Sequence, residues 1–163
     1  MMNINIIDIE ASGLHFDSHP IEIAVLVNGQ TRSWLIKPEP NWKYWNATAE
    51  SLHGISREQL ASEGLPAIQV ARELSDFLQD SNGLVYSDAV YWDTDWIDTL
   101  YSATKQDRHF HIVSIYDLLD GSQKALFEEQ LKVLAGSGAY RHHRAAEDVR
   151  MIYDAYLLAL EGI

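Results

Sequence analysis

The chain has 163 residues, 47% of them hydrophobic, and a formal net charge of −12 at neutral pH. This length fits one domain, expected over residues 1–163, whose core buries roughly 70% of the surface that the unfolded chain exposes. Charges interrupt the apolar stretches well before membrane-spanning length, and the absence of cysteine excludes disulfides and thiolate metal sites. Any metal must therefore be bound by oxygen or imidazole.

The excess of acidic residues limits the partners that the protein can bind, and its first residues bear on its location. Because Lys and Arg supply the affinity for long phosphate backbones, 12 of them against 24 Asp and Glu argue against broad, non-specific phosphate binding. We expect short or locally bound substrates; acidity that only keeps the protein soluble is the alternative. Residues 1–10 have no basic region and are interrupted by Asp8, unlike a signal peptide, so we expect a cytoplasmic protein with no membrane partner.

The first part of the chain predicts a three-stranded antiparallel meander. Residues 3–10 and 21–27 are apolar, rich in β-branched side chains and bounded by turn-forming residues. The pair Asn28-Gly29, between residues 21–27 and 31–36, is the strongest short-range signal for a β-hairpin. These three segments should therefore pair in chain order.

The middle of the chain predicts an irregular segment and then helices. After Pro38 and Pro40 comes a Trp-rich stretch, followed by short helical pieces at residues 48–53 and 56–60. A longer helix is expected from Pro66, a residue that favours helix starts. Its buried stripe at helical spacing consists of Val70, Leu74, Phe77 and Leu78.

The second half alternates predicted strands and helices. Strands are expected at residues 83–87 and 111–115, and helices at about residues 93–104 and 123–135. The clearest helix closes the chain, where apolar residues recur at helical spacing: Ala145, Val149, Ile152, Tyr153, Tyr156 and Leu160. A meander followed by strand–helix units predicts an α/β fold with a mixed five-stranded sheet flanked by helices.

An acidic pair ends the first predicted strand. Asp8 and Glu10 are two residues apart, so both carboxylates project from one face of the strand, close enough to share metal ions. Unpaired burial of either carboxylate would cost several kcal/mol, so each needs a cation, a proton or solvent. Many strands end in exposed acids, and the pair alone is weak evidence for a metal site.

A third acid follows the predicted strand at residues 83–87. Asp93 lies where that strand gives way to a helix, the place at which α/β sheets bind ligands. Helix capping is the alternative role for Asp93, and Asp88 and Asp95 are local competitors for the functional one.

The entrance to the last helix carries a histidine and a further acid. His143 and Asp148 are five residues apart, which on a regular helix would place them roughly 140° apart. They converge only if His143 lies in the preceding loop, as the nearby residues 136–138, Gly-Ser-Gly, allow. The alternative is a surface histidine before an ordinary helix, whose N-terminal dipole Asp148 stabilises.

Together these residues resemble the DnaQ-like (DEDDh) 3′-5′ exonuclease superfamily, which has an RNase H-like fold. The residues that follow its order and approximate spacing are Asp8, Glu10, Asp93, His143 and Asp148. Residues 8–14, 53–56 and 143–145 are similar to the family's motifs, so the resemblance covers nearly the whole chain. Arg144 stands where the sibling subclass has its tyrosine base, which favours the histidine subclass. One more residue than usual separates Ala89 from Asp93.

The resemblance implies a metal-dependent enzyme that hydrolyses phosphodiester bonds at the 3′ end of single-stranded RNA or DNA and releases nucleoside 5′-monophosphates. Short oligonucleotides are among the expected substrates. His143 would accept the proton of the attacking water, since the neighbouring His142 lacks the five-residue spacing to the last acid. Two divalent cations, Mg²⁺ or Mn²⁺, would be ligated by Asp8, Glu10, Asp93 and Asp148.

The resemblance also implies where the 3′ terminus binds. The segment Ala11, Ser12, Gly13 and Leu14 matches the terminal-nucleotide site, in which backbone groups contact the 3′ hydroxyl and Leu14 wedges beside the last base. His53 either approaches the terminal nucleotide or forms a structural hydrogen bond. Five aromatic residues could stack on unpaired bases: Trp42, Tyr44, Trp45, Trp92 and Trp96. Several of them are expected in the core, Trp96 first, and those at 42–45 could equally serve a homodimer.

Two alternatives stay open at this point. One is a catalytically silent nucleic-acid-binding or adaptor domain on the same fold. The other is a metal-dependent endonuclease of the wider RNase H-like group. Nothing in the sequence distinguishes RNA from DNA, because the expected contacts are to phosphate, metal and the 3′ end, not to a 2′-hydroxyl.

Overall fold

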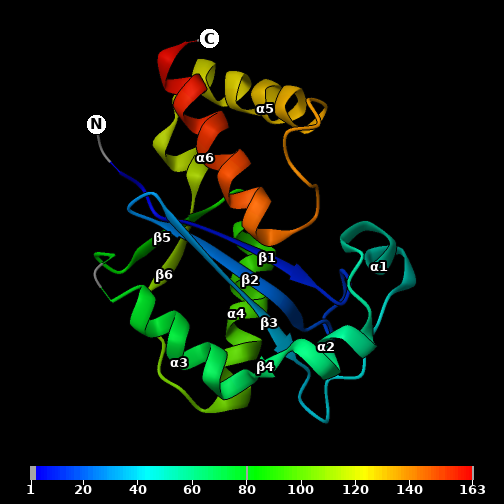
Figure 1. Ribbon diagram of the computed structural model, residues 1–163. Helices are drawn as coiled ribbons and strands as arrows, with labels where there is room; N and C mark the ends of the chain where they lie inside the picture. Colours follow the sequence, from blue (N-terminus) through cyan, green and yellow to red (C-terminus); the bar gives the residue numbers. More distant parts are fainter. Residues whose placement is uncertain (1–2, 80, 163) are drawn as a thin grey trace.

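A six-stranded mixed sheet forms the centre of the computed structural model, which describes residues 3–79 and 81–162 (Figure 1). Its strand order is β4-β3-β2-β1-β5-β6. The first three strands pair antiparallel, whereas β5 and β6 continue the sheet parallel to β1, and β4 pairs parallel with β3. The strands are β1 (Ile6–Ala11), β2 (Pro20–Val27), β3 (Gln30–Lys37), β4 (Leu65–Pro66), β5 (Leu84–Ser87) and β6 (His111–Ser114).

Helices cover both faces of this sheet (Figure 1). Three helices end in a left-handed residue and α5 starts with a full capping box from Asp120 and Gln123. No helix within the described residues is both long and apolar enough to cross a bilayer. The helices are α1 (Ala47–His53), α2 (Arg57–Glu63), α3 (Ala67–Phe77), α4 (Val90–Thr104), the 3₁₀ helix η1 (Ile115–Leu118), α5 (Gly121–Ala135) and α6 (Ala145–Glu161).

The predicted meander is confirmed, and its hairpin has the expected cause. Asn28 and Gly29 both adopt positive φ, 52° and 78°, which is the backbone of a two-residue turn matched to the strand twist. β2 is buried along its whole length because helices lie over both of its faces. This strand and β1 therefore form the most enclosed part of the sheet.

Alternation along β1 decides which layer its acids face. Ile7 and Ile9 pack with α3 and α4 in one core, whereas Ile6 packs with α6 in the other. Because side chains alternate along a strand, Asp8 and Glu10 share the face of Ile6. Both carboxylates therefore point toward the layer that contains α6.

Several element ends differ by one to three residues from the sequence-based expectation, and two differences bear on the architecture and the site. The sheet has six strands because the two residues before α3 pair with the end of β3. α4 begins at Val90, earlier than expected, because the Ser87 hydroxyl accepts the Ala89 N–H at 2.9 Å and turns the chain directly out of β5. Asp93 consequently lies within the first turn, so the alternative reading of it as the helix cap is wrong; the capping position is Ala89.

Gly64 joins α2 to β4 at a place with no room for a side chain. A Cβ there would lie 2.4 Å from the Leu60 carbonyl oxygen and 2.5 Å from the Lys37 nitrogen, both backbone atoms. We predict that Gly64→Ala lowers the free energy of unfolding by about 1–3 kcal/mol, measured by urea denaturation. Gly121→Ala is the matched control, since nothing lies within 4 Å of its added Cβ. Equal destabilisation in both variants would contradict the close approach.

Candidate metal and active site

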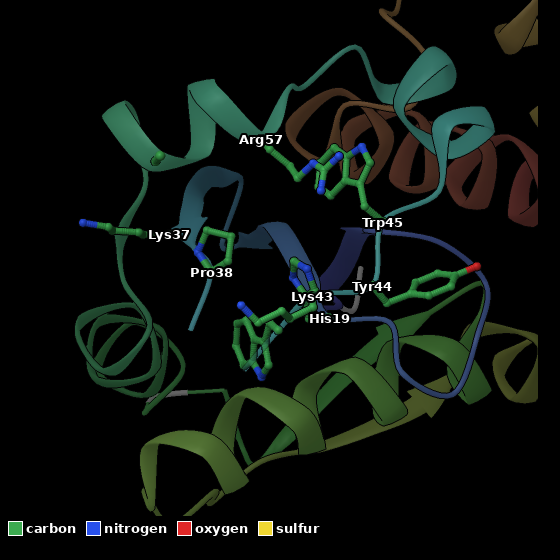
Figure 2. Close-up of a pocket in the computed structure, with 9 residues that line it drawn as sticks. His19, Lys37, Pro38, Lys43, Tyr44, Trp45 and Arg57 are labelled. Atoms are coloured by element: carbon green, nitrogen blue, oxygen red, sulfur yellow. The ribbon is translucent and has the colours of Figure 1, made fainter. Parts of the chain in front are cut away.

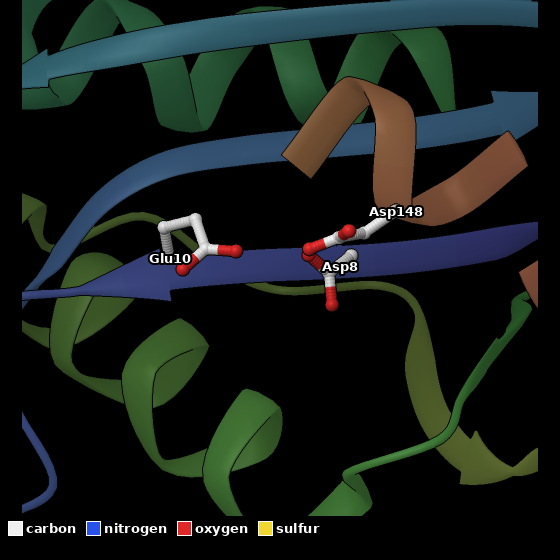
Figure 3. A group of neighbouring side chains, drawn as sticks. All are labelled: Asp8, Glu10 and Asp148. Atoms are coloured by element: carbon white, nitrogen blue, oxygen red, sulfur yellow. The ribbon is translucent and has the colours of Figure 1, made fainter. Parts of the chain in front are cut away.

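Three carboxylates from opposite ends of the chain converge beside β1 (Figure 3). Asp8 and Glu10 come from the strand, and Asp148 comes from the first turn of α6. One carboxylate oxygen of each residue lies within 4.8 Å of the others. Carboxylate oxygens at this separation are suitable ligands for a hard divalent cation.

Electrostatics shows that this cluster needs a positive partner. Burial, and then the charges of Asp93 and Asp148, raise the pKa of Asp8 well above its usual value. Burial and contact with Asp148 raise the pKa of Glu10 to about 9. Burial likewise raises the pKa of Asp148. Among the residues that the structure describes, the buried Oδ2 of Asp8 has no hydrogen-bond partner. This unpaired oxygen is a second observation, besides charge, that fits a metal ion at these carboxylates.

Asp93 lies next to this group but outside the set of three. Its carboxylate is 1% exposed and accepts a 2.6 Å hydrogen bond from the Ser87 hydroxyl at the end of β5. Burial raises the pKa of Asp93 well above the usual value. Among the neighbouring charges, that of Asp93 raises the pKa of Asp8 most. Burial and Asp148 raise the pKa of Asp88 to about 6. Asp93 and its competitor Asp88 therefore both lie close enough to the cluster for their charges to act on it.

The two adjacent histidines have different environments. His143 is exposed and lies in the loop before α6 with φ +57°, as convergence with Asp148 requires. A positive charge on His143 or on His142 acts on Asp148 in the same direction, so this effect does not distinguish the two rings. His142, in contrast, is half-buried and its Nε2 bonds the carbonyl of Ala135 at the end of α5. One ring is thus tied to the fold, and the other is accessible to solvent.

A buried ion pair that the sequence analysis missed fixes the start of α6. Glu22 is 2% exposed and faces Glu10 across the β1–β2 ladder. Its carboxylate accepts hydrogen bonds from Arg144 Nε at 3.1 Å, from the same guanidinium at 2.8 Å, and from the Ala145 N–H at 2.8 Å. The sequence did contain a signal for this ion pair, because Glu22 lies inside an apolar strand and such an acid is rarely buried without a partner. This contact holds the first turn of α6, and hence Asp148, against the sheet.

The turn after β1 combines a rigid backbone with an exposed apolar side chain. The Ser12 N–H donates to the His19 carbonyl, and the His19 N–H donates to the Ser12 hydroxyl, each at 3.0 Å. Gly13 packs so closely on Tyr44 that an added Cβ would lie 2.7 Å from its ring. Leu14 is 70% exposed next to this turn. The segment 11–14 is therefore a fixed turn that presents Leu14 to solvent.

His53 has one satisfied and one free ring nitrogen. Its Nδ1 accepts the Ile55 N–H at 3.0 Å, so the proton of the neutral ring is on Nε2. That Nε2 atom is buried and has no hydrogen-bond partner within residues 3–79 and 81–162. Burial lowers the pKa of His53, and Glu22, Arg144 and His143 are among the charges that act on it. The Nε2–H of His53 thus lies near the residues at the start of α6 whose charges act on this ring.

Comparison with known proteins shows the fold of this chain but not its sequence family. No family model and no curated protein matches the sequence. Among solved structures, Escherichia coli Exonuclease I in complex with a dT13 oligonucleotide matches with a TM-score of 0.74 and 15% identity, over 95% of this chain and 40% of that one. The zinc-bound form of its single-stranded DNA complex matches with a TM-score of 0.74 and 17% identity, over 97% and 40% of the two chains.

A third neighbour is the moderately thermophilic Exonuclease I from Methylocaldum szegediense, with a TM-score of 0.73 and 18% identity, over 95% of this chain and 40% of that one. The chain thus spans about 40% of the length of these neighbours. The expected fold is confirmed: the mixed sheet and its helices are those of the exonuclease structures. At 15–18% identity, the similarity to these structures shows the fold of the chain, and the fold alone does not determine the activity.

The raised pKa values predict how pH changes the stability of the metal-free protein. The folded chain keeps a proton on Glu10 that the unfolded chain releases above about pH 4.5, so the contribution of Glu10 to stability is full below that pH and is lost as the pH rises toward about 9. The pKa of Asp8 is raised in the same direction, so its contribution is likewise full at acid pH and is lost as the pH rises. Asp8→Asn removes one of these charges. In EDTA its melting temperature should equal that of the wild type near pH 5 and exceed it by roughly 3 °C or more near pH 8.

Differential scanning calorimetry across this pH range measures the difference. Mg²⁺ should raise the melting temperature of the wild type, mostly at the higher pH, and leave that of Asp8→Asn almost unchanged. A wild type that is more stable than Asp8→Asn at every pH in EDTA would contradict the repulsion within the cluster.

Proposed function

We propose that this protein is a 3′-5′ exonuclease that removes nucleotides from the 3′ end of single-stranded nucleic acid with the help of divalent cations. The observation that carries the proposal is the convergence of Asp8, Glu10 and Asp148 around a buried, unpartnered carboxylate oxygen. It occurs on the fold of Exonuclease I, whose structures include complexes with single-stranded DNA and a zinc-bound form. A cytoplasmic location stays a prediction.

The acids of this site would hold Mg²⁺ or Mn²⁺. The group of three offers only carboxylate oxygens, which both ions prefer, and Asp93 would complete a set able to hold two ions. When bound, such cations offset the charge on the reacting phosphate and make a water molecule easier to deprotonate. The mutual repulsion of the acids makes the empty cluster costly, which a domain without catalysis would have no need to keep.

His143 is the proposed proton acceptor. An exposed imidazole is a chemically suitable acceptor for a proton from water beside the scissile phosphate. Its position in the loop before α6 leaves the ring accessible, whereas the bond from His142 to Ala135 occupies the neighbouring ring.

The turn at residues 11–14 is the proposed site of the 3′ terminal nucleotide. Its backbone would contact the 3′ hydroxyl, and the exposed Leu14 would lie against the last base. The unpartnered Nε2–H of His53 would donate to the same nucleotide. None of these contacts reads the 2′-hydroxyl, so both RNA and DNA are proposed substrates.

The direct test is digestion of matched, end-labelled RNA and single-stranded DNA oligonucleotides. With Mg²⁺ or Mn²⁺, 5′-labelled strands should shorten one nucleotide at a time and release nucleoside 5′-monophosphates, whereas EDTA and Asp8→Asn should abolish the reaction. A strand with a blocked 3′ end is the control. Internal cutting of that strand would mean an endonuclease, and binding without any cleavage would mean a silent domain.

The adjacent histidines provide a matched pair of variants. His143→Ala should lower kcat by about 10²–10⁴-fold, the usual contribution of a positioned proton acceptor. His142→Ala should keep kcat within about tenfold of the wild type, because this ring serves the packing of the loop. Circular dichroism checks that both variants fold. An inactive His142→Ala beside an active His143→Ala would refute the assignment.

A further inference from the structure

A cavity of about 320 Å³ opens on the side of the molecule where β3 ends and α2 begins (Figure 2). Its volume lies within the range of small-ligand sites and suits one nucleotide. Neither the acid cluster nor the turn at residues 11–14 contributes to its lining. The residues that matter for its chemistry are His19, Lys37, Trp42, Lys43, Trp45 and Arg57.

The cavity is positive on a protein whose net charge is −12. No Asp or Glu of the described chain lines it. In the part of the chain that the structure describes, Lys37, Lys43 and Arg57 form no ion pair with a carboxylate. Figure 2 shows Arg57 beside Trp45, while Lys37 extends outward at the rim. Unpaired cations around a hollow suit a phosphate group.

Flat aromatic faces accompany these cations. Trp42 stacks on the buried His19 with ring centroids 5.2 Å apart and planes at 17°. The Arg57 guanidinium lies 5.4 Å from the centroid of Trp45. Both tryptophans are half-buried, so part of each ring remains accessible. Aromatic rings beside cations bind nucleotides, because the ring stacks on a base while the cation contacts its phosphate.

The wall of the cavity is bonded to the proposed 3′ site. The Asn46 N–H, one residue after Trp45, donates to the Ser12 carbonyl at 2.8 Å, and Ser12 is in turn bonded to His19. The Trp45 ring also packs edge-on against His53 at 5.9 Å. A strand whose 3′ end lies at the turn of residues 11–14 would therefore have the cavity beside it.

We propose that this cavity binds a nucleotide upstream of the 3′ end of the same single strand, with Lys43 and Arg57 on its phosphates and Trp42 or Trp45 stacked on its base. This inference rests on the proposed function, and it adds that the protein recognises a nucleotide upstream of the one it removes. It also accounts for how an acidic protein holds a polyanion: the contacts are local, at one positive hollow, and do not form a basic stripe.

The test is a double charge reversal, Lys43→Glu with Arg57→Glu. In the Asp8→Asn background, the affinity for a fluorescent single strand of about eight nucleotides should fall about tenfold at low salt, measured by anisotropy. The slope of the logarithm of the binding constant against the logarithm of the salt concentration is negative, and its magnitude should decrease by about 1.4. Each lost contact with a single-strand phosphate accounts for about 0.7. With the active site intact, cleavage of the p-nitrophenyl ester of thymidine 5′-monophosphate should be unchanged, because that substrate carries no upstream nucleotide that could occupy the cavity.

The matched control is Arg72→Glu with Lys124→Glu, which changes the net charge equally at exposed positions on α3 and α5 outside the cavity. Equal losses of affinity in both double variants would overturn the proposal in favour of bulk charge. Loss of cleavage of the p-nitrophenyl ester in the cavity variant would also overturn it, as would competition by a free nucleoside monophosphate as strong as that by the strand. If the wild type cuts no oligonucleotide, the exonuclease proposal fails. This result differs from each of the outcomes that would overturn the cavity proposal.

Discussion

The repulsion between carboxylates gathered in a partly enclosed space is the constraint on which this structure depends. Asp8 and Glu10 cannot move apart, because they occupy alternate positions on a strand buried between two helical layers. Asp148 cannot withdraw, because Glu22, Arg144 and the Ala145 N–H hold the first turn of its helix against the sheet. The fold therefore keeps like charges together at a cost of several kcal/mol, which protons or cations relieve.

Much of the fold could be predicted from local patterns. The hairpin at Asn28 and Gly29 followed from backbone preference, and α6 followed from an apolar repeat over 17 residues. What local patterns could not predict was set by contacts across the sheet. The two-residue β4 exists only because β3 offers an edge, and the early start of α4 depends on the Ser87 hydroxyl.

The site could be predicted in part for the same reason. Spacing alone placed Asp8 and Glu10 on one face, and the resemblance between distant motifs brought Asp148 to them. The Glu22–Arg144 pair escaped prediction because it joins residues far apart in sequence that have no shared motif. The sequence left Asp88, Asp93 and Asp95 as competitors, and in the structure the first two lie close enough to the cluster for their charges to act on it, while the role of Asp93 as a ligand stays a prediction.

The separation of Asp8 and Asp148 along the chain has a consequence for folding. One belongs to the first strand and the other to the last helix, so a cation shared between them would act as a removable cross-link that closes nearly the whole polypeptide into a loop. Because these ligands come together only in the folded chain, binding of the ion would stabilise the folded state by mass action. The ion that such chemistry requires would thus add to the Glu22–Arg144 contact in fastening the last helix to the first strand.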